Sequence, residues 1–112
     1  MSRHDDTVRL RHMLDHAREA IEMASGRNRG DLDKDRMLNL ALVRLIEIIG
    51  EAASCVSEHE RVAWQEIPWA QIIGTRHRII HGYDVINLDI LWAVIQSDLP
   101  PLIDQLERIL GE

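Results

Sequence analysis

Apolar residues recur every three or four positions through most of this chain. In its first quarter the residues at this spacing are Leu10, Leu14, Ala17, Ile21 and Ala24. Such spacing predicts one apolar stripe along an α-helix, whereas a half-buried strand would alternate apolar and polar residues. The sequence shows no such alternation and no hairpin signal, so we expect an all-α protein.

The first two helices are bounded by recognisable start and stop residues. The first is expected from about residue 5 to residue 25, ending at Gly26, because glycine commonly follows a helix C-terminus. After a polar loop, Asp31 or Asp33 is the expected N-cap of a second helix, whose apolar face extends over residues 38–56.

Two small residues of the second helix are given packing roles. Gly50 costs about 1 kcal/mol relative to alanine inside a helix, so we expect another helix to pack closely against it. Cys55 is the only cysteine, so it cannot form a disulfide within the chain. Its neighbours Ala52 and Val56 indicate a buried position.

The second half of the chain predicts two more helices. Residues 57–67 form a breaker region, and Pro68 suits the first turn of a third helix that is expected to fail near Gly82. Asn87 is the expected cap of a fourth helix. The Pro100-Pro101 pair should kink or split that helix, because proline removes a backbone donor and clashes with the preceding turn. The expected fold is an antiparallel up-and-down four-helix bundle.

Composition indicates one domain over residues 1–112. The chain is 46% hydrophobic and contains no Phe, so we expect an aliphatic core with Trp64, Trp69 and Trp92 as its bulky anchors. No stretch approaches the length that spans a bilayer, and the first residues lack the apolar run of a signal peptide. We therefore expect a cytoplasmic protein that has no membrane contact.

A basic segment stands out from an acidic chain. The net charge of −6 argues against general nucleic-acid binding, which depends on Lys and Arg neutralising phosphates. Residues 67–83, however, contain no Asp or Glu. They include Arg76, His77, Arg78 and His81. Any contact with RNA is expected to be confined to this segment.

RNA cleavage through the 2′-hydroxyl needs a base, an acid and cationic groups for the charge on phosphorus. On one continuous helix, Arg76 and His81 would lie about 140° apart and would not form a local pair. A symmetric dimer would supply each residue twice, without a metal or other cofactor. The spacing from Arg76 to His81 is by itself weak support for RNA cleavage, because Arg11 and His16 have the same spacing.

When the residues around the Arg76-to-His81 spacing are included, the sequence resembles the HepT-like branch of the HEPN superfamily. Three blocks carry the resemblance: IEIIGEA at residues 46–52, PWAQIIG at 68–74 leading to Tyr83, and LDILW at 88–92 leading to DLP at 98–100. The family motif is Arg, four residues, His, any residue, Tyr, often with a polar residue after the Arg. Arg76, His77, His81 and Tyr83 complete it.

The resemblance implies a toxin that acts as a metal-independent endoribonuclease, in which a homodimer forms the active site from Arg76 and His81. It also implies a nucleotidyltransferase antitoxin that uses ATP and Mg²⁺ to transfer AMP onto Tyr83. Bulky negative charge there would repel RNA.

Four neighbouring residues are assigned supporting roles. Arg78 adds a cation that could replace or assist Arg76, and His77 follows Arg76 directly. Glu47 and Glu51 could orient these cations, although a polar helix stripe is the simpler interpretation of the two glutamates.

Other interpretations stay open. The chain could be a noncatalytic helical partner, or a subunit that presents a substrate to a nucleotidyltransferase. His81 could simply be a helix C-terminal residue that contacts free carbonyls. His12 and His16 have the spacing of a metal-binding pair on one helix, and Glu19 shares their face, but a solvent-facing surface is the expectation.

Overall fold

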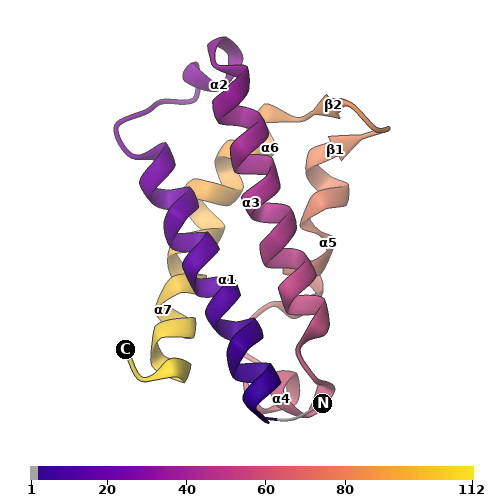
Figure 1. The fold of residues 1–112 in the computed structure, drawn as a ribbon. Helices are drawn as coiled ribbons and strands as arrows, with labels where there is room; N and C mark the ends of the chain where they lie inside the picture. The colour runs from indigo at the N-terminus through magenta and orange to yellow at the C-terminus, as the bar shows by residue number, and fades with distance from the viewer. Residues whose placement is uncertain (1–2) are drawn as a thin grey trace.

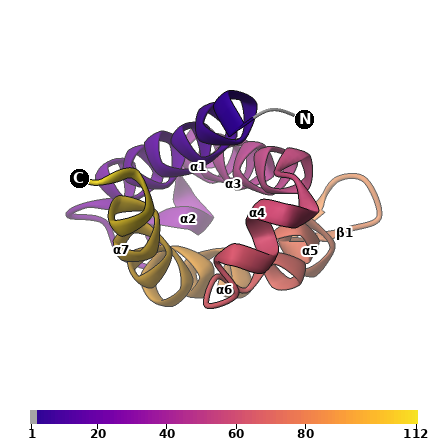
Figure 2. The ribbon, with the colours of Figure 1, turned by 90° about the horizontal axis from the view of Figure 1, so that it is seen from below.

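The computed structural model describes residues 3–112, and in it four helical rods run alternately up and down around a common core (Figure 1). Rod α1 packs against α3 and α7, and α3 also packs against α5 (Figure 2). The predicted all-α bundle is confirmed. In chain order the rods are α1 (Arg3–Ala24), α3 (Arg36–Cys55), α5 (Trp69–Ile79), and a composite of α6 (Leu88–Ala93), the π-helix η1 (Val94–Asp98) and α7 (Leu99–Leu110).

The connection into α3 differs from the expectation. Gly26 has a φ of +77° and follows the end of α1, as predicted. Asp31 and Asp33, however, lie inside a one-turn helix, α2 (Asp31–Lys34), so the prediction that one of them caps α3 is wrong. Asp35 is the cap, because its carboxylate accepts the N–H of Leu38. That hydrogen bond lowers the pKa of Asp35.

The expected breaker region between α3 and α5 contains a further helix, α4 (Glu58–Ala63). Ser57 caps it by accepting the N–H of Glu60. The buried carboxylate of Asp6, on α1, accepts both the N–H of Ser57, at 2.8 Å, and its hydroxyl, at 2.7 Å. These bonds fix the start of α4 against the bundle, so this segment is more ordered than its sequence indicated.

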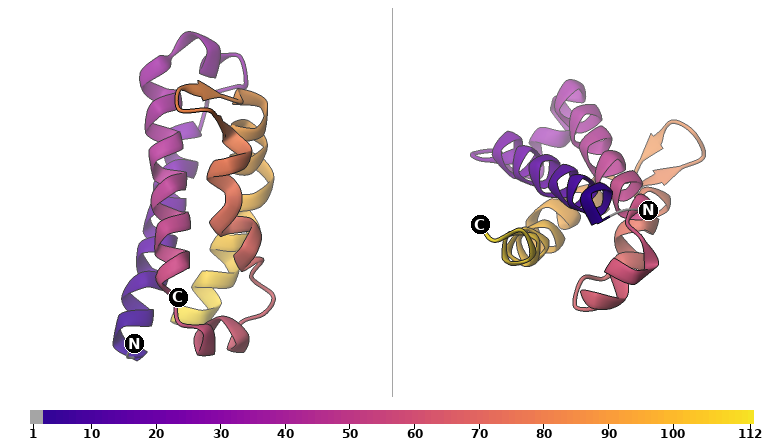
Figure 3. Two further views of the ribbon diagram at one scale, coloured as in Figure 1. Left: turned by 90° about the vertical axis from the view of Figure 1, so that its right-hand side faces the viewer. Right: turned by 60° about the horizontal axis from the view of Figure 1, so that its bottom comes forward.

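A β-hairpin follows α5, where the sequence predicted helix as far as Gly82 and no strands. The helix ends at Ile79, and β1 (Ile80–His81) pairs antiparallel with β2 (Val85–Ile86). Gly82 has a φ of +69°, a conformation that glycine adopts without steric cost, and it allows the chain to reverse. Figure 3 shows the hairpin projecting from the bundle. The expected helix end and the absence of a hairpin are therefore both wrong.

The composite fourth rod confirms the predicted cap and break. The side chain of Asn87 accepts the N–H of Ile90 at the start of α6. Pro100 and Pro101 stand in the first turn of α7, directly after η1. The N–H of Leu99 reaches back five residues to the carbonyl of Val94, so the π-helix widens the rod before the prolines.

The core is aliphatic, as expected, but the prediction for Cys55 is wrong. Cys55 is exposed. The core face at the end of α3 contains Ala52, Ala53 and Val56, and Cys55 lies on the opposite, solvent side. The small apolar residues near Cys55 in the sequence therefore do not predict on which side of the helix its thiol lies. Of the tryptophans, Trp69 is buried and the other two are partly buried against the core.

Gly50 makes the close helix contact that the sequence predicted. A Cβ at this position would lie 3.3 Å from the carbonyl oxygen of Ile72 on α5. A Cβ on Gly74, also helical, would meet nothing within 4 Å. The two glycines therefore provide a matched pair for testing how closely α3 and α5 must approach.

We predict opposite effects for alanine at these two positions. Gly74→Ala should raise the free energy of unfolding by about 0.5–1 kcal/mol, through helix propensity alone. Gly50→Ala should lower it by roughly 1 kcal/mol, because pushing α5 away outweighs the same gain. Urea unfolding followed by circular dichroism measures both values. Equal stabilisation by the two variants would show that the α3–α5 contact tolerates a methyl group.

Candidate active site

Arg76 lies in the last turn of α5 and is held against α3 by an acidic partner. Its Nε donates to Oε2 of Glu47 at 2.6 Å. The Arg76 side chain is 50% exposed, whereas that of Glu47 is 20% exposed. A charge-assisted bond of this length restricts the arginine while leaving much of it open to solvent. Of the two glutamates that the sequence proposed, Glu47 is the one that contacts Arg76.

Glu51 has a different partner, although it lies near the same contact. Its Oε1 is 3.5 Å from a terminal nitrogen of Arg44, which lies seven residues earlier on the same face of α3. Glu51, Glu47 and Arg76 all line a shallow groove of about 150 Å³ between α3 and α5. Both carboxylates therefore border the groove beside Arg76, but only Glu47 is positioned to orient that side chain directly.

Arg78 points to another part of the molecule. A terminal nitrogen of Arg78 lies 3.8 Å from Oδ2 of Asp98, at the end of η1. Two residues along a helix correspond to a rotation of about 200°, which explains why Arg76 faces α3 and Arg78 faces the composite rod. Within one protomer, Arg78 is therefore badly placed to replace Arg76. Asp98 was not predicted as its partner, because the pairing depends on the π-helix.

The other motif residues are exposed at the end of α5 and on the hairpin. His77 is exposed in the last turn of α5, and His81 is exposed on β1. Tyr83, in the turn between the strands, is 92% exposed. The 140° separation calculated for Arg76 and His81 does not apply, because the helix ends between them. His81 is likewise not at a helix C-terminus.

A single chain thus leaves the side chains of Arg76, His77, His81 and Tyr83 open to solvent. Arg76 supplies a fixed cation, and His81 supplies an exposed imidazole ring. These groups can bind phosphate and move protons. A single His81 cannot act as acid and base in the same step, so the surface of one protomer lacks a catalytic group that the predicted reaction needs.

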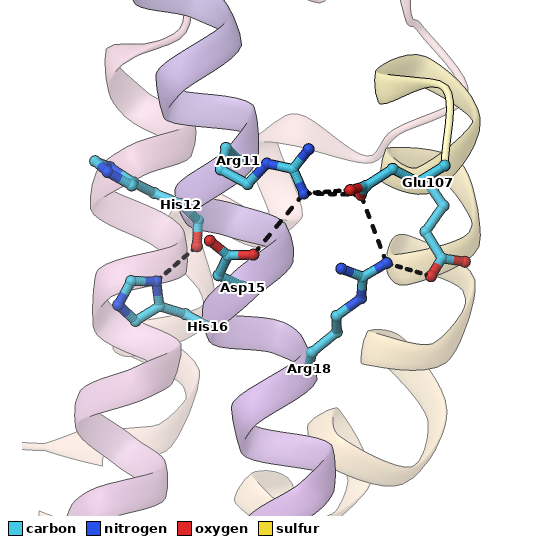
Figure 4. A network of polar contacts seen from close by, with 7 residues as sticks. Arg11, His12, Asp15, His16, Arg18 and Glu107 are labelled. Atoms are coloured by element: carbon cyan, nitrogen blue, oxygen red, sulfur yellow. Dashed lines mark hydrogen bonds and ion pairs between the residues drawn. The ribbon is translucent and has the colours of Figure 1, made fainter.

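Arg11, the arginine of the second Arg-to-His spacing, which runs from Arg11 to His16, stabilises the fold. Arg11 bonds the carboxylate of Glu112 at 2.7 Å, and Arg18 bonds Glu107 at 2.6 Å, so these arginines tie α1 to the end of the chain (Figure 4). Contact with Arg11 lowers the pKa of Glu112. The two copies of the spacing therefore have different surroundings, since Arg11 ties α1 to Glu112, just beyond the end of α7, and Arg76 borders an open groove.

His12 and His16 contact each other on the exposed side of α1. Nδ1 of His16 lies 2.6 Å from the backbone carbonyl of His12, and the two rings meet edge to face (Figure 4). Within residues 3–112 no group of three or more His, Cys, Asp or Glu side chains is placed to hold a metal ion. The same residues include no helix that is both long and apolar enough to cross a membrane.

Comparisons with known proteins give a consistent result. The model of a family described as "HepT-like: Ribonuclease HepT-like" matches residues 13–109, which include the whole segment from Arg76 to Tyr83. The protein named "Putative RNase TTE0752" from Caldanaerobacter subterraneus subsp. tengcongensis is 37% identical over 101 residues, covering 90% of each chain. "Probable ribonuclease HepT" from Thermococcus cleftensis is 30% identical over 86% of this chain and 91% of its own. No solved structure gives a significant match.

Proposed function

The chain belongs to the HepT-like ribonuclease family, and from this membership we propose that it is an endoribonuclease toxin whose active site is built from two copies of residues 76–83. The observation that carries the proposal is that Arg76, fixed by Glu47 at the end of α5, and His81, on the strand that follows, both present solvent-exposed surface. A symmetric homodimer that joins two such surfaces supplies the missing histidine.

The proposed reaction uses the two histidines in different protonation states. Neutral His81 of one protomer takes the proton of a 2′-hydroxyl, and the 2′-oxygen attacks the adjacent phosphorus. Protonated His81 of the other protomer donates its proton to the departing 5′-oxygen. The products are a 2′,3′-cyclic phosphate and a free 5′-hydroxyl. The two Arg76 guanidiniums stabilise the negative charge that develops on the phosphoryl oxygens.

The neighbouring residues have positioning and binding roles in this proposal. Glu47 holds Arg76 through the 2.6 Å bond, so it orients a cation without touching RNA. His77 is exposed directly after Arg76 and can contact a flanking phosphate. Arg78, whose terminal nitrogen is 3.8 Å from Asp98, forms only a loose ion pair between α5 and η1 and can also contribute positive charge beside the motif.

We predict that purified protein cleaves RNA in the presence of EDTA and leaves 2′,3′-cyclic phosphate ends or their hydrolysis products. The same sequence made as DNA should stay intact, because it lacks the attacking hydroxyl. Gel analysis of end-labelled oligonucleotides, with and without EDTA and added Mg²⁺, measures both results. Failure to cut cellular RNA, together with normal growth when the protein is expressed alone, would favour the noncatalytic helical partner instead.

We also propose that a nucleotidyltransferase antitoxin neutralises the toxin by transferring AMP from ATP onto Tyr83. The 92% exposure of Tyr83, in the turn of the hairpin, makes its hydroxyl accessible to another enzyme's active site. An adenylyl group there would bring negative charge near His81 and Arg76 and would compete with RNA for the same cations.

The expected result of incubation with such an enzyme, ATP and Mg²⁺ is a mass increase of one or more adenylyl groups, accompanied by loss of RNA cleavage. Intact-mass spectrometry and peptide mapping locate the modification. Tyr83→Phe, which removes only the hydroxyl, should remain unmodified and keep its cleavage activity in the presence of the enzyme. Inhibition of Tyr83→Phe to the same extent as the unsubstituted protein would show that neutralisation occurs by binding alone.

A further inference from the structure

A cavity of about 270 Å³ lies between α5 and the composite fourth rod, and it shares Ile46 and Ile72 with the groove that holds Arg76. Its apolar wall combines side chains from three rods. These are Ile46 and Ile49 of α3, Ile72 of α5, Val94 of η1, and Leu99 and Leu102 of α7. For comparison, an engineered apolar cavity of roughly 150 Å³ is large enough to bind benzene. The space here suits a ring with a short side chain.

The π-helix and the prolines account for this space. Helix α7 starts only after the widened turn of η1, and Pro101 lines the cavity directly. Neither Pro100 nor Pro101 has an N–H to donate to the carbonyl four residues earlier, at Gln96 and Ser97 respectively. The rod therefore cannot continue as a regular helix at the level where it faces α5.

The polar rim of the cavity is acidic. Glu66 and Asp98 line it together with Gln71 and Gln105, and none of the described residues that line it is basic. Asp98 is only loosely engaged, since Nε2 of Gln71 is 3.5 Å from Oδ2 and the Arg78 nitrogen is 3.8 Å away. Charge-assisted hydrogen bonds are ordinarily about 2.7–2.9 Å long, so this carboxylate can accept a shorter bond from a new donor.

We propose that this cavity is a binding site for a small amphipathic amine, with its apolar body among the isoleucines and its ammonium group at Asp98. The chemistry follows from the two halves of the site. The wall offers dispersion contacts to an apolar body, and the rim offers the loosely engaged carboxylate of Asp98 as an anionic acceptor. A carboxylate ligand of the same shape would meet the carboxylate of Asp98 with like charge. The site requires neither RNA nor the proposed ribonuclease chemistry.

The test compares three probes of nearly equal size: phenethylamine, phenethyl alcohol and 3-phenylpropionate. Methyl NMR of the full-length protein should show shifts at Ile46, Ile49 and Ile72 on addition of phenethylamine. Its affinity should exceed that of 3-phenylpropionate by about tenfold or more, the ratio that one charge-assisted bond provides. No shift at these methyl groups, or equal affinity for the amine and the anion, would overturn the proposal.

Two sets of variants test separately the contribution of the Asp98 charge and that of the cavity volume. Asp98→Asn should weaken phenethylamine binding by about tenfold and leave phenethyl alcohol nearly unchanged, whereas Asp104→Asn, an exposed carboxylate of α7 that does not line the cavity, should change neither.

Leu102→Phe should fill the cavity and abolish binding of all three probes. If that variant does not fold, Ser97→Trp closes the mouth from an exposed position. Retained binding in a folded variant of either kind would contradict the proposed location. So would loss of all probe binding whenever the protein is dimeric, because the second copy would then occupy this face.

Discussion

Replacement of His81 by alanine is expected to lower kcat for RNA cleavage by at least about a thousandfold. Proton transfer by a positioned side chain contributes roughly 10²–10⁴-fold, and in the proposed dimer one substitution removes the acid and the base together. His81 is exposed and lies on a two-residue strand, so the variant should unfold at the same urea concentration as the unsubstituted protein. Single-turnover cleavage of a labelled RNA, at saturating protein, measures the effect on chemistry.

His59→Ala is the matched control, because His59 is also exposed but lies on α4, outside the motif. It should leave kcat within about twofold, since exposed substitutions away from functional groups change little. Cleavage by His81→Ala within tenfold of the unsubstituted protein would remove His81 from the chemistry. The Arg76–Glu47 surface would then be only a binding site for RNA.

The helices could be predicted from the sequence because their signals are local. Apolar spacing, the glycine after α1, the asparagine before α6 and the proline pair each act within a few residues, and the structure confirms them. The cap of α3 was missed for a related reason. Three aspartates stand close together before α3, and the short helix α2 takes two of them, leaving Asp35 as the cap.

The hairpin was missed because strands of two residues are too short to show alternation. The motif around Gly82 instead read as the end of a long helix, and this placed His81 on the wrong element. Only the positive φ of Gly82 and the pairing of Ile80 with Ile86 show the reversal. The angle between Arg76 and His81 could not have been obtained from a helical projection.

The partners of the two arginines depend on contacts between rods. Glu47 could be anticipated, since a glutamate on the polar stripe of α3 was expected beside the basic segment, and the 2.6 Å contact identifies which one. Asp98 could not, because its position depends on the extra residue that η1 adds to the turn. Long-range pairing of this kind has no signal in the spacing of the chain.

The strongest test of the composite site uses mixtures of subunits. When unsubstituted protein and His81→Ala are mixed in equal amounts and exchange freely, only about one quarter of the dimers carry two intact copies. If both His81 side chains are needed in one reaction, activity should fall to about one quarter of that of the same total amount of unsubstituted protein. If each protomer acts alone, it should fall to about one half.

A second mixture tests the division of roles directly. Dimers formed from Arg76→Ala and His81→Ala contain one Arg76 and one His81, so a mechanism that needs two histidines predicts that mixing restores no activity. Recovery of cleavage would contradict the acid and base pair and would indicate a site with one arginine and one histidine from different subunits. Co-expression with two affinity tags isolates this heterodimer, and its cleavage rate decides between the two mechanisms.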